Sequence, residues 1–229
     1  MNYNYDEIDQ FTPYGRISSR VYNLIFGGCV CWGLLANYLI CCFFTDAVLS
    51  MNPLILIAGY VIFAFAGIMM SKYSTNPYIS FIGYNLVVIP IGLVLSLTLE
   101  SYGGVDSYIV QEAFLCTLII VFIMCGAAFL FPYKFVGIGP VLFSGLIGVI
   151  IARAGCYFFG FGENIICWIS AIIFSFYIGY DMVQAFSKER TADNAVDSAV
   201  DLYLDIINLF IHLLAILGNN SDSRGRRGR

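Results

Sequence analysis

The chain has 229 residues, of which 60% are hydrophobic and only 11% are charged, and its formal net charge is −4. A soluble domain carries about 25% charged residues, so this composition excludes a water-facing surface over most of the chain. It predicts a polytopic membrane protein whose main partner is the lipid bilayer. The negative net charge offers no electrostatic basis for a nucleic-acid partner.

Seven hydrophobic runs are long enough to cross a hydrocarbon core of about 30 Å as helices. The runs cover 24–44, 53–71, 78–99, 109–131, 135–152, 165–184 and 199–218. The last run is amphipathic, while the others are more uniformly apolar. Runs of this length are too long for the strands of a barrel, and the linkers are too short to fold separately. We therefore expect an all-α seven-transmembrane-helix bundle.

The ends of the chain frame this bundle. We expect a short solvated N-terminal segment over 1–22, the seven-helix transmembrane domain over 23–218 and a basic C-terminal tail over 219–229. The first run is too long for the apolar region of a signal peptide, and no cleavage-site pattern follows it. It is therefore interpreted as a retained helix.

Basic residues orient the bundle. If the N-terminus is cytoplasmic, one side of the membrane collects Arg16, Arg20, Lys72, Lys134, Lys188 and Arg190. Only Arg153 falls in an opposite loop, which is a positive-inside pattern. The tail sequence SRGRRGR disagrees, because seven spans place its arginines outside. Either the tail crosses the membrane despite its charge or the seventh run is re-entrant, and the loop residues favour seven spans.

Two features are typical of helix packing rather than chemistry. The eight cysteines lie almost wholly within the spans, and they show no metal or redox spacing, so we interpret them as small apolar packing residues. Small residues stand four apart in two runs, Gly92 with Ser96 and Ser144 with Gly148. Such pairs suit close helix contact but are common in membrane helices.

Polar residues form a stripe on each of the last two runs. One stripe has the spacing i, i+4 and i+7 and consists of Tyr177, Asp181 and Gln184. The other has the spacing i, i+4, i+7 and i+11 and consists of Asp201, Asp205, Asn208 and His212. Each set shares one helix face. Because carboxylates that face lipid are costly, both stripes are predicted to face the bundle interior.

Asp181 and Asp205 are predicted to meet. If the sixth helix ends near Phe186 and the seventh starts near Ser198, both carboxylates lie on the order of 8–10 Å below the cytoplasmic surface. A short loop joins the two antiparallel helices. Two carboxylates in a low-dielectric site do not both ionise readily, so we expect the pair to share one proton.

Such a pair can serve one of three chemical roles. It can act as a pH-sensitive latch, bind a hard cation such as Ca²⁺ through its oxygens, or activate water as in aspartic proteases. Protonation and cation binding compete for the same oxygens, so the first two roles are coupled. The structural alternative is two separate aspartates, each bonded to a neighbouring tyrosine or asparagine.

Five other polar residues are candidates for a latch or a pore, and three of them also have a structural interpretation. Glu112 either attracts cations at the outer mouth or helps to cap its helix. Lys72, at the cytoplasmic end of the second run, either pairs with Asp181 and closes a pore or anchors its helix as a positive-inside residue. Asp201 and Asn208 share the stripe of Asp205 and are candidates for lining a pore. His212 is the only histidine, and it is either part of that pore or a packed helix residue.

At these residues the chain resembles the transmembrane Bax inhibitor motif family. The strongest match is YIGYDMVQ followed by LYLDIINLFIHLLAILG, and weaker matches are IPIGLVLS, VQEAFLCT and GLIGVIIA. The resemblance covers about residues 20–218. It implies seven helices with the last one central, and a pH-sensitive calcium leak in which Asp181 and Asp205 form a hydrogen-bonded sensor. Where the bacterial pattern has a basic latch residue, Ser71 and Lys72 stand here, so Lys72 is the expected substitute.

The expected function is a pH-sensitive calcium leak channel, with Ca²⁺ as the transported ion, no cofactor and no enzymatic activity. The alternative is a non-conducting regulator that binds a membrane protease or a cell-death protein. An intramembrane aspartyl protease is disfavoured, because Asp205 stands in LYLD rather than Gly-x-Gly-Asp and no Pro-Ala-Leu follows. The expected location is multi-pass in a cell membrane, the plasma membrane of a bacterium or the endoplasmic reticulum of a eukaryote.

Overall fold

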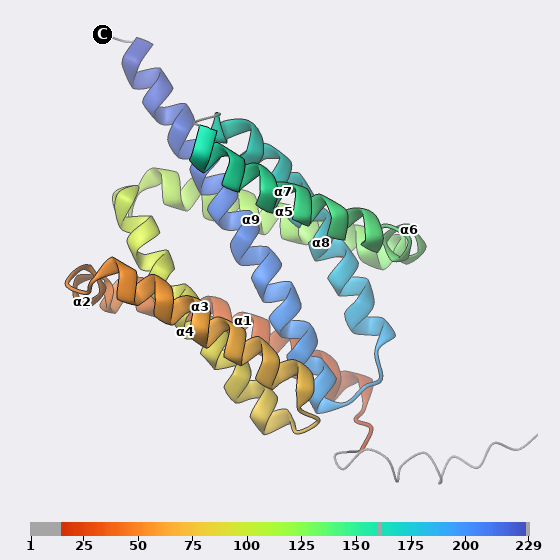
Figure 1. Ribbon diagram of the computed structural model, residues 1–229. Helices are drawn as coiled ribbons and strands as arrows, with labels where there is room; N and C mark the ends of the chain where they lie inside the picture. The colour runs from red at the N-terminus through yellow and green to blue at the C-terminus, as the bar shows by residue number, and fades with distance from the viewer. Residues whose placement is uncertain (1–14, 160–161, 228–229) are drawn as a thin grey trace, which may run out of the picture. The chain divides into compact units, whose positions relative to one another are not determined.

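The computed structural model describes residues 15–159 and 162–227 (Figure 1). Within these ranges the regular structure is entirely helical. The helices are α1 (Ser19–Phe43), α2 (Thr45–Leu49), α3 (Pro53–Tyr73), α4 (Pro77–Ser101), α5 (Tyr108–Leu130), α6 (Pro132–Val136), α7 (Gly139–Phe159), α8 (Glu163–Ser187) and α9 (Ala192–Arg227). Seven of these are long and apolar enough to cross a membrane. The predicted all-α, multi-pass membrane class is therefore confirmed.

Polar side chains at the helix starts explain why several helices begin where they do. A side-chain oxygen there accepts a hydrogen bond from an otherwise unpaired backbone N–H, which stabilises the first turn. The capping residues are Ser18, Asn52, Asn76 and Thr191, which accept from the backbone N–H groups of Val21, Leu54, Tyr78 and Asn194. Between α4 and α5 the chain turns through Gly103 and Gly104, both at positive φ, where a side chain is disfavoured.

The described chain divides into two compact units. Unit 1 contains α1 to α4, the linker after α8, and α9 as far as Tyr203. Unit 2 contains α5 to α7, α8 as far as Phe186, and α9 from Leu204 onward. The long helix α9 therefore contributes residues to both units. The single transmembrane domain expected over 23–218 stays a prediction.

Unit 1 is held together by close approaches of small residues. A Cβ atom added at Gly67 of α3 would lie 2.5 Å from the carbonyl oxygen of Gly83 in α4, and one added at Gly83 would lie 2.7 Å from the carbonyl oxygen of Gly67. The backbones of α3 and α4 therefore touch at this point, as small residues allow in membrane helices. Gly33 of α1 leaves room for the hydroxyl of Tyr84 and the ring of Tyr203 in the same way.

Unit 2 has its own apolar core, formed by the buried side chains of Ala128, Phe135 and Val183. Phe135 belongs to the short helix α6 and packs against Gly179 of α8, where an added Cβ would lie 2.2 Å from its ring. This contact fixes the α5–α7 connection against α8.

Four boundaries differ from the prediction. Helix α9 begins at Ala192 rather than near residue 199. Asp193 and Asp197 lower the hydropathy of its first turns, but both carboxylates accept hydrogen bonds from serines inside unit 1, as described below. Helix α7 continues to Phe159, which places Arg153 inside a helix and not in a loop. Helix α1 begins at Ser19, inside the segment 1–22 that was predicted to be solvated; residues 1–14 of that segment lie outside the described ranges. The predicted tail 219–229 continues α9 as far as Arg227, and residues 228–229 are also outside.

Candidate functional site

Four aspartates follow one another along α9 at intervals of four residues. They are Asp193, Asp197, Asp201 and Asp205. Residues at this spacing lie on one side of a helix. Sequence reasoning found the last two but missed Asp193 and Asp197, because they precede the apolar run. The same i, i+4 periodicity, continued backwards from Asp201, would have identified them.

In unit 1, the first two aspartates accept hydrogen bonds from buried serines. Asp193 and Asp197 are 9% and 8% exposed, and Ser80 and Ser71 are fully buried. Ser80 Oγ of α4 donates to Asp193 Oδ1 over 2.5 Å, and Ser71 Oγ of α3 donates to Asp197 Oδ1. Buried carboxylates are costly unless such partners are present. These bonds attach the first turns of α9 to α4 and α3.

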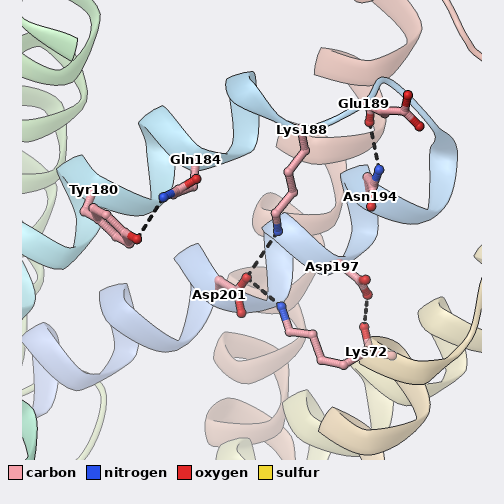
Figure 2. A network of polar contacts seen from close by, with 9 residues as sticks. Lys72, Tyr180, Gln184, Lys188, Glu189, Asn194, Asp197 and Asp201 are labelled. Atoms are coloured by element: carbon pink, nitrogen blue, oxygen red, sulfur yellow. Dashed lines mark hydrogen bonds and ion pairs between the residues drawn. The ribbon is translucent and has the colours of Figure 1, made fainter. Parts of the chain in front are cut away.

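Asp201, one turn further along, lies between two lysines. Its Oδ2 atom is 2.7 Å from Lys72 Nζ and 3.7 Å from Lys188 Nζ (Figure 2). All three side chains are about one-third exposed, so solvent screening limits the strength of the pairs. Sequence analysis singled out Lys72 and Asp201 separately, and the structure brings them together. The pairing of Lys72 with Asp181 stays a prediction.

Asp181 and Asp205 both belong to unit 2. Asp205 is 7% exposed, and Asp181 is half-buried on α8. Both carboxylates lie close enough to the hydroxyl of Tyr177, one turn before Asp181, to interact with it electrostatically. Gln184, the third residue of the predicted α8 stripe, donates from Nε2 to the hydroxyl of Tyr180 over 2.8 Å (Figure 2).

Asp181 and Asp205 lie at different distances from the ends of their helices, and not at the nearly equal distances predicted. Measured along the helices at 1.5 Å per residue, Asp181 lies about 9 Å before the end of α8, whereas Asp205 lies about 20 Å after the start of α9. The difference arises because α9 starts at Ala192. Each carboxylate interacts electrostatically with Tyr177, and direct contact between the two carboxylates stays a prediction.

Two further residues of the α9 stripe have contacts in unit 2. Asn208 donates from Nδ2 to the carbonyl oxygen of Leu204 in its own helix, over 2.8 Å. The ring of the buried His212 stacks on Phe174 of α8, with centroids 5.6 Å apart and planes 21° apart. His212 Nδ1 also lies 3.1 Å from a guanidinium nitrogen of Arg153 in α7. Arg153 was missed as a site residue because it was assigned to a loop.

Glu112 lies in the second turn of α5 and is half-buried. Both interpretations of this residue stay open, because its place near the helix start suits a capping role as well as an acidic mouth. Among the described residues, no three side chains of His, Cys, Asp or Glu are grouped so that they could hold a metal ion. A Ca²⁺ ion takes about six to eight oxygen ligands, so the aspartate pair alone would hold a calcium ion only with water or backbone oxygens in addition.

The fold and these side chains define a class: an all-α, multi-pass membrane protein with carboxylates and a guanidinium inside its spans. The family model "Inhibitor of apoptosis-promoting Bax1" matches residues 16–222. The chain belongs to this Bax inhibitor family, which confirms the resemblance seen in its sequence motifs.

Relatives occur in bacteria and in a plant. An uncharacterised protein of Helicobacter pylori is 33% identical over 170 residues, which is 70% of this chain and 70% of the relative. An uncharacterised membrane protein of Streptococcus pyogenes is 34% identical over 137 residues, covering 56% of this chain and 58% of the relative. A BI1-like protein of Arabidopsis thaliana is 33% identical over 141 residues, covering 58% and 55%.

Proposed function

We propose that this protein is a pH-sensitive calcium leak channel in which Asp181 and Asp205 form both the proton sensor and the cation site. The observation that supports this function is a buried carboxylate on α9, Asp205 at 7% exposure, which together with Asp181 of α8 acts electrostatically on Tyr177 in unit 2. Carboxylates within membrane spans are expensive and are usually retained for ion or proton handling.

The chemistry follows from competition for the carboxylate oxygens. When the two aspartates share a proton, one hydrogen bond occupies the oxygens that a cation would need. When that proton leaves, the pair carries two negative charges and attracts a divalent cation. Water supplies the remaining ligands, and weak coordination of this kind lets the ion leave again. The calcium leak is therefore expected to rise with pH over the range in which the shared proton is lost.

Calcium uptake into proteoliposomes tests this function. The purified full-length chain is reconstituted with an internal calcium dye, and initial uptake rates are measured from pH 5 to pH 8. We expect a sloping profile for the unmodified protein. Asp181→Asn and Asp205→Asn should each flatten that profile, because neither variant retains two carboxylates that can share a proton.

A matched control is Asp46→Asn, which changes an exposed aspartate in the short helix α2 and should leave the profile unchanged. Uptake whose pH dependence is the same in both pair variants as in the unmodified protein would contradict the sensor role. The absence of uptake at every pH would overturn the channel and favour the alternative, a regulator that acts by binding another membrane protein.

A further inference from the structure

The contact between Arg153 and His212 fixes a positive charge within unit 2. A guanidinium nitrogen of Arg153 lies 3.1 Å from His212 Nδ1 and 3.9 Å from the Sγ atom of Cys167. Arginine has donors only, so Nδ1 of the imidazole must accept this hydrogen bond. It follows that His212 is neutral in this arrangement, with its proton on Nε2, and that the guanidinium carries the only positive charge of the contact.

The imidazole itself has little freedom to move. His212 is 6% exposed, and its ring is stacked on Phe174 of α8. The ring therefore offers Arg153 a fixed acceptor. Arg153 is itself exposed on α7, so without this acceptor its guanidinium would keep only the longer contact with Cys167 Sγ.

The guanidinium charge of Arg153 lies beside His212, the last residue of the polar stripe on α9. His212 follows Asp205 by about two turns, or about 10 Å along the helix axis. Arg153 lies in the last turns of α7, and Glu163 lies in the first turn of α8. Arg153 and Glu163 line the same small pocket together with Cys156 and Ile166. In the orientation predicted by the basic loop residues, this is the outer end of unit 2.

We propose that Arg153, positioned by His212, limits the entry of cations from the outer end of the α9 stripe and sets the ratio of divalent to monovalent leak. This inference rests on the proposed channel function. A fixed positive charge raises the energy of any approaching cation, and basic residues are used in this way to exclude cations from pores. Glu163, which lines the same pocket, partly offsets the charge.

Electrostatics gives this inference a quantitative signature. The Coulomb energy between a fixed charge and an ion is proportional to the charge of the ion. If removal of the arginine charge lowers the barrier for a monovalent ion by a given amount, it lowers the barrier for a divalent ion by twice that amount. Rates depend exponentially on barriers. The factor by which Ca²⁺ flux rises should therefore be the square of the factor for Na⁺.

The experiment compares Na⁺ and Ca²⁺ uptake by the full-length chain in proteoliposomes, with the membrane potential clamped at zero by K⁺ and valinomycin. For Arg153→Gln we expect Na⁺ uptake to rise about three-fold and Ca²⁺ uptake about nine-fold. Arg153→Lys retains the charge and is the matched control, so its Ca²⁺/Na⁺ ratio should stay close to that of the unmodified protein.

A second variant keeps the test decisive if Arg153→Gln does not fold. Glu163→Gln removes the offsetting negative charge at an exposed position, so it should lower Ca²⁺ uptake by more than Na⁺ uptake. His212→Phe removes the acceptor and should raise the Ca²⁺/Na⁺ ratio, by less than Arg153→Gln does.

Two results overturn the inference in distinguishable ways. Equal factors for Na⁺ and Ca²⁺ in the variants of Arg153 and Glu163 would show that these residues affect only the opening of the pore; the proposed function would then stand without this inference. No uptake of either ion by the unmodified protein at any pH would overturn both the proposed channel function and this inference.

Discussion

At the scale of single residues, burial decides which polar contacts in unit 1 matter most. Ser71 and Lys72 are neighbours at the end of α3, and each contacts an aspartate of α9. Ser71 is fully buried, whereas the side chain of Lys72 is 37% exposed. Water competes for the lysine pair but does not reach the serine, so the neutral hydroxyl is the more important contact for stability.

Two adjacent substitutions test this ordering. Ser71→Ala leaves the buried carboxylate of Asp197 without its hydroxyl donor and should lower the free energy of unfolding by about 1–3 kcal/mol. Lys72→Gln should cost less than about 1 kcal/mol, because partly exposed ion pairs are weak. Thermal unfolding in detergent measures both. A larger loss for Lys72→Gln than for Ser71→Ala would contradict the role assigned to burial.

At the scale of helices, a few glycines set how closely neighbours pack. The added-Cβ distances at Gly67 and Gly83 show that α3 and α4 meet backbone to backbone. Gly148 of α7 has nothing within 4 Å of an added Cβ. The two kinds of glycine look alike in the sequence, since all three residues stand in apolar helices.

Alanine substitutions separate these two kinds of glycine. Gly67→Ala must push α4 away from α3 and should cost about 1–3 kcal/mol of stability, as overpacking does. Gly148→Ala is the control and should be neutral or slightly stabilising, because alanine favours helix over glycine by up to about 1 kcal/mol. The measurement is the unfolding midpoint in one detergent. Equal destabilisation by both would mean that α3 and α4 do not touch at Gly67.

At the scale of the whole molecule, the loop charges predict how the chain crosses the membrane. With seven spans and a cytoplasmic N-terminus, the turn between α4 and α5 lies outside, and the short helix α6 lies inside with its basic residue Lys134. The turn carries the exposed Asp106. In this orientation, water-soluble reagents reach Asp106 only from outside the cell and Lys134 only from the cytoplasm.

Labelling of intact cells tests this orientation. Asp106→Cys should react with a membrane-impermeant maleimide, and Lys134→Cys should react only after the cells are broken open. Both are compared with the unmodified chain, whose eight cysteines are all free thiols. Reaction of Lys134→Cys in intact cells together with protection of Asp106→Cys would reverse the orientation, and would put Arg153 and His212 at the inner end.

The sequence by itself determined the membrane class, the number of spans and the family, because hydropathy and local motifs are properties of neighbouring residues. It also gave Asp181, Asp205 and the α9 stripe, since helical periodicity can be read without a partner helix. Three-dimensional packing decided what each polar residue contacts. Asp201 pairs with Lys72, Ser71 with Asp197, and His212 with Arg153. These partners are far apart in the chain, and only the folded arrangement of helices sets the distances between them.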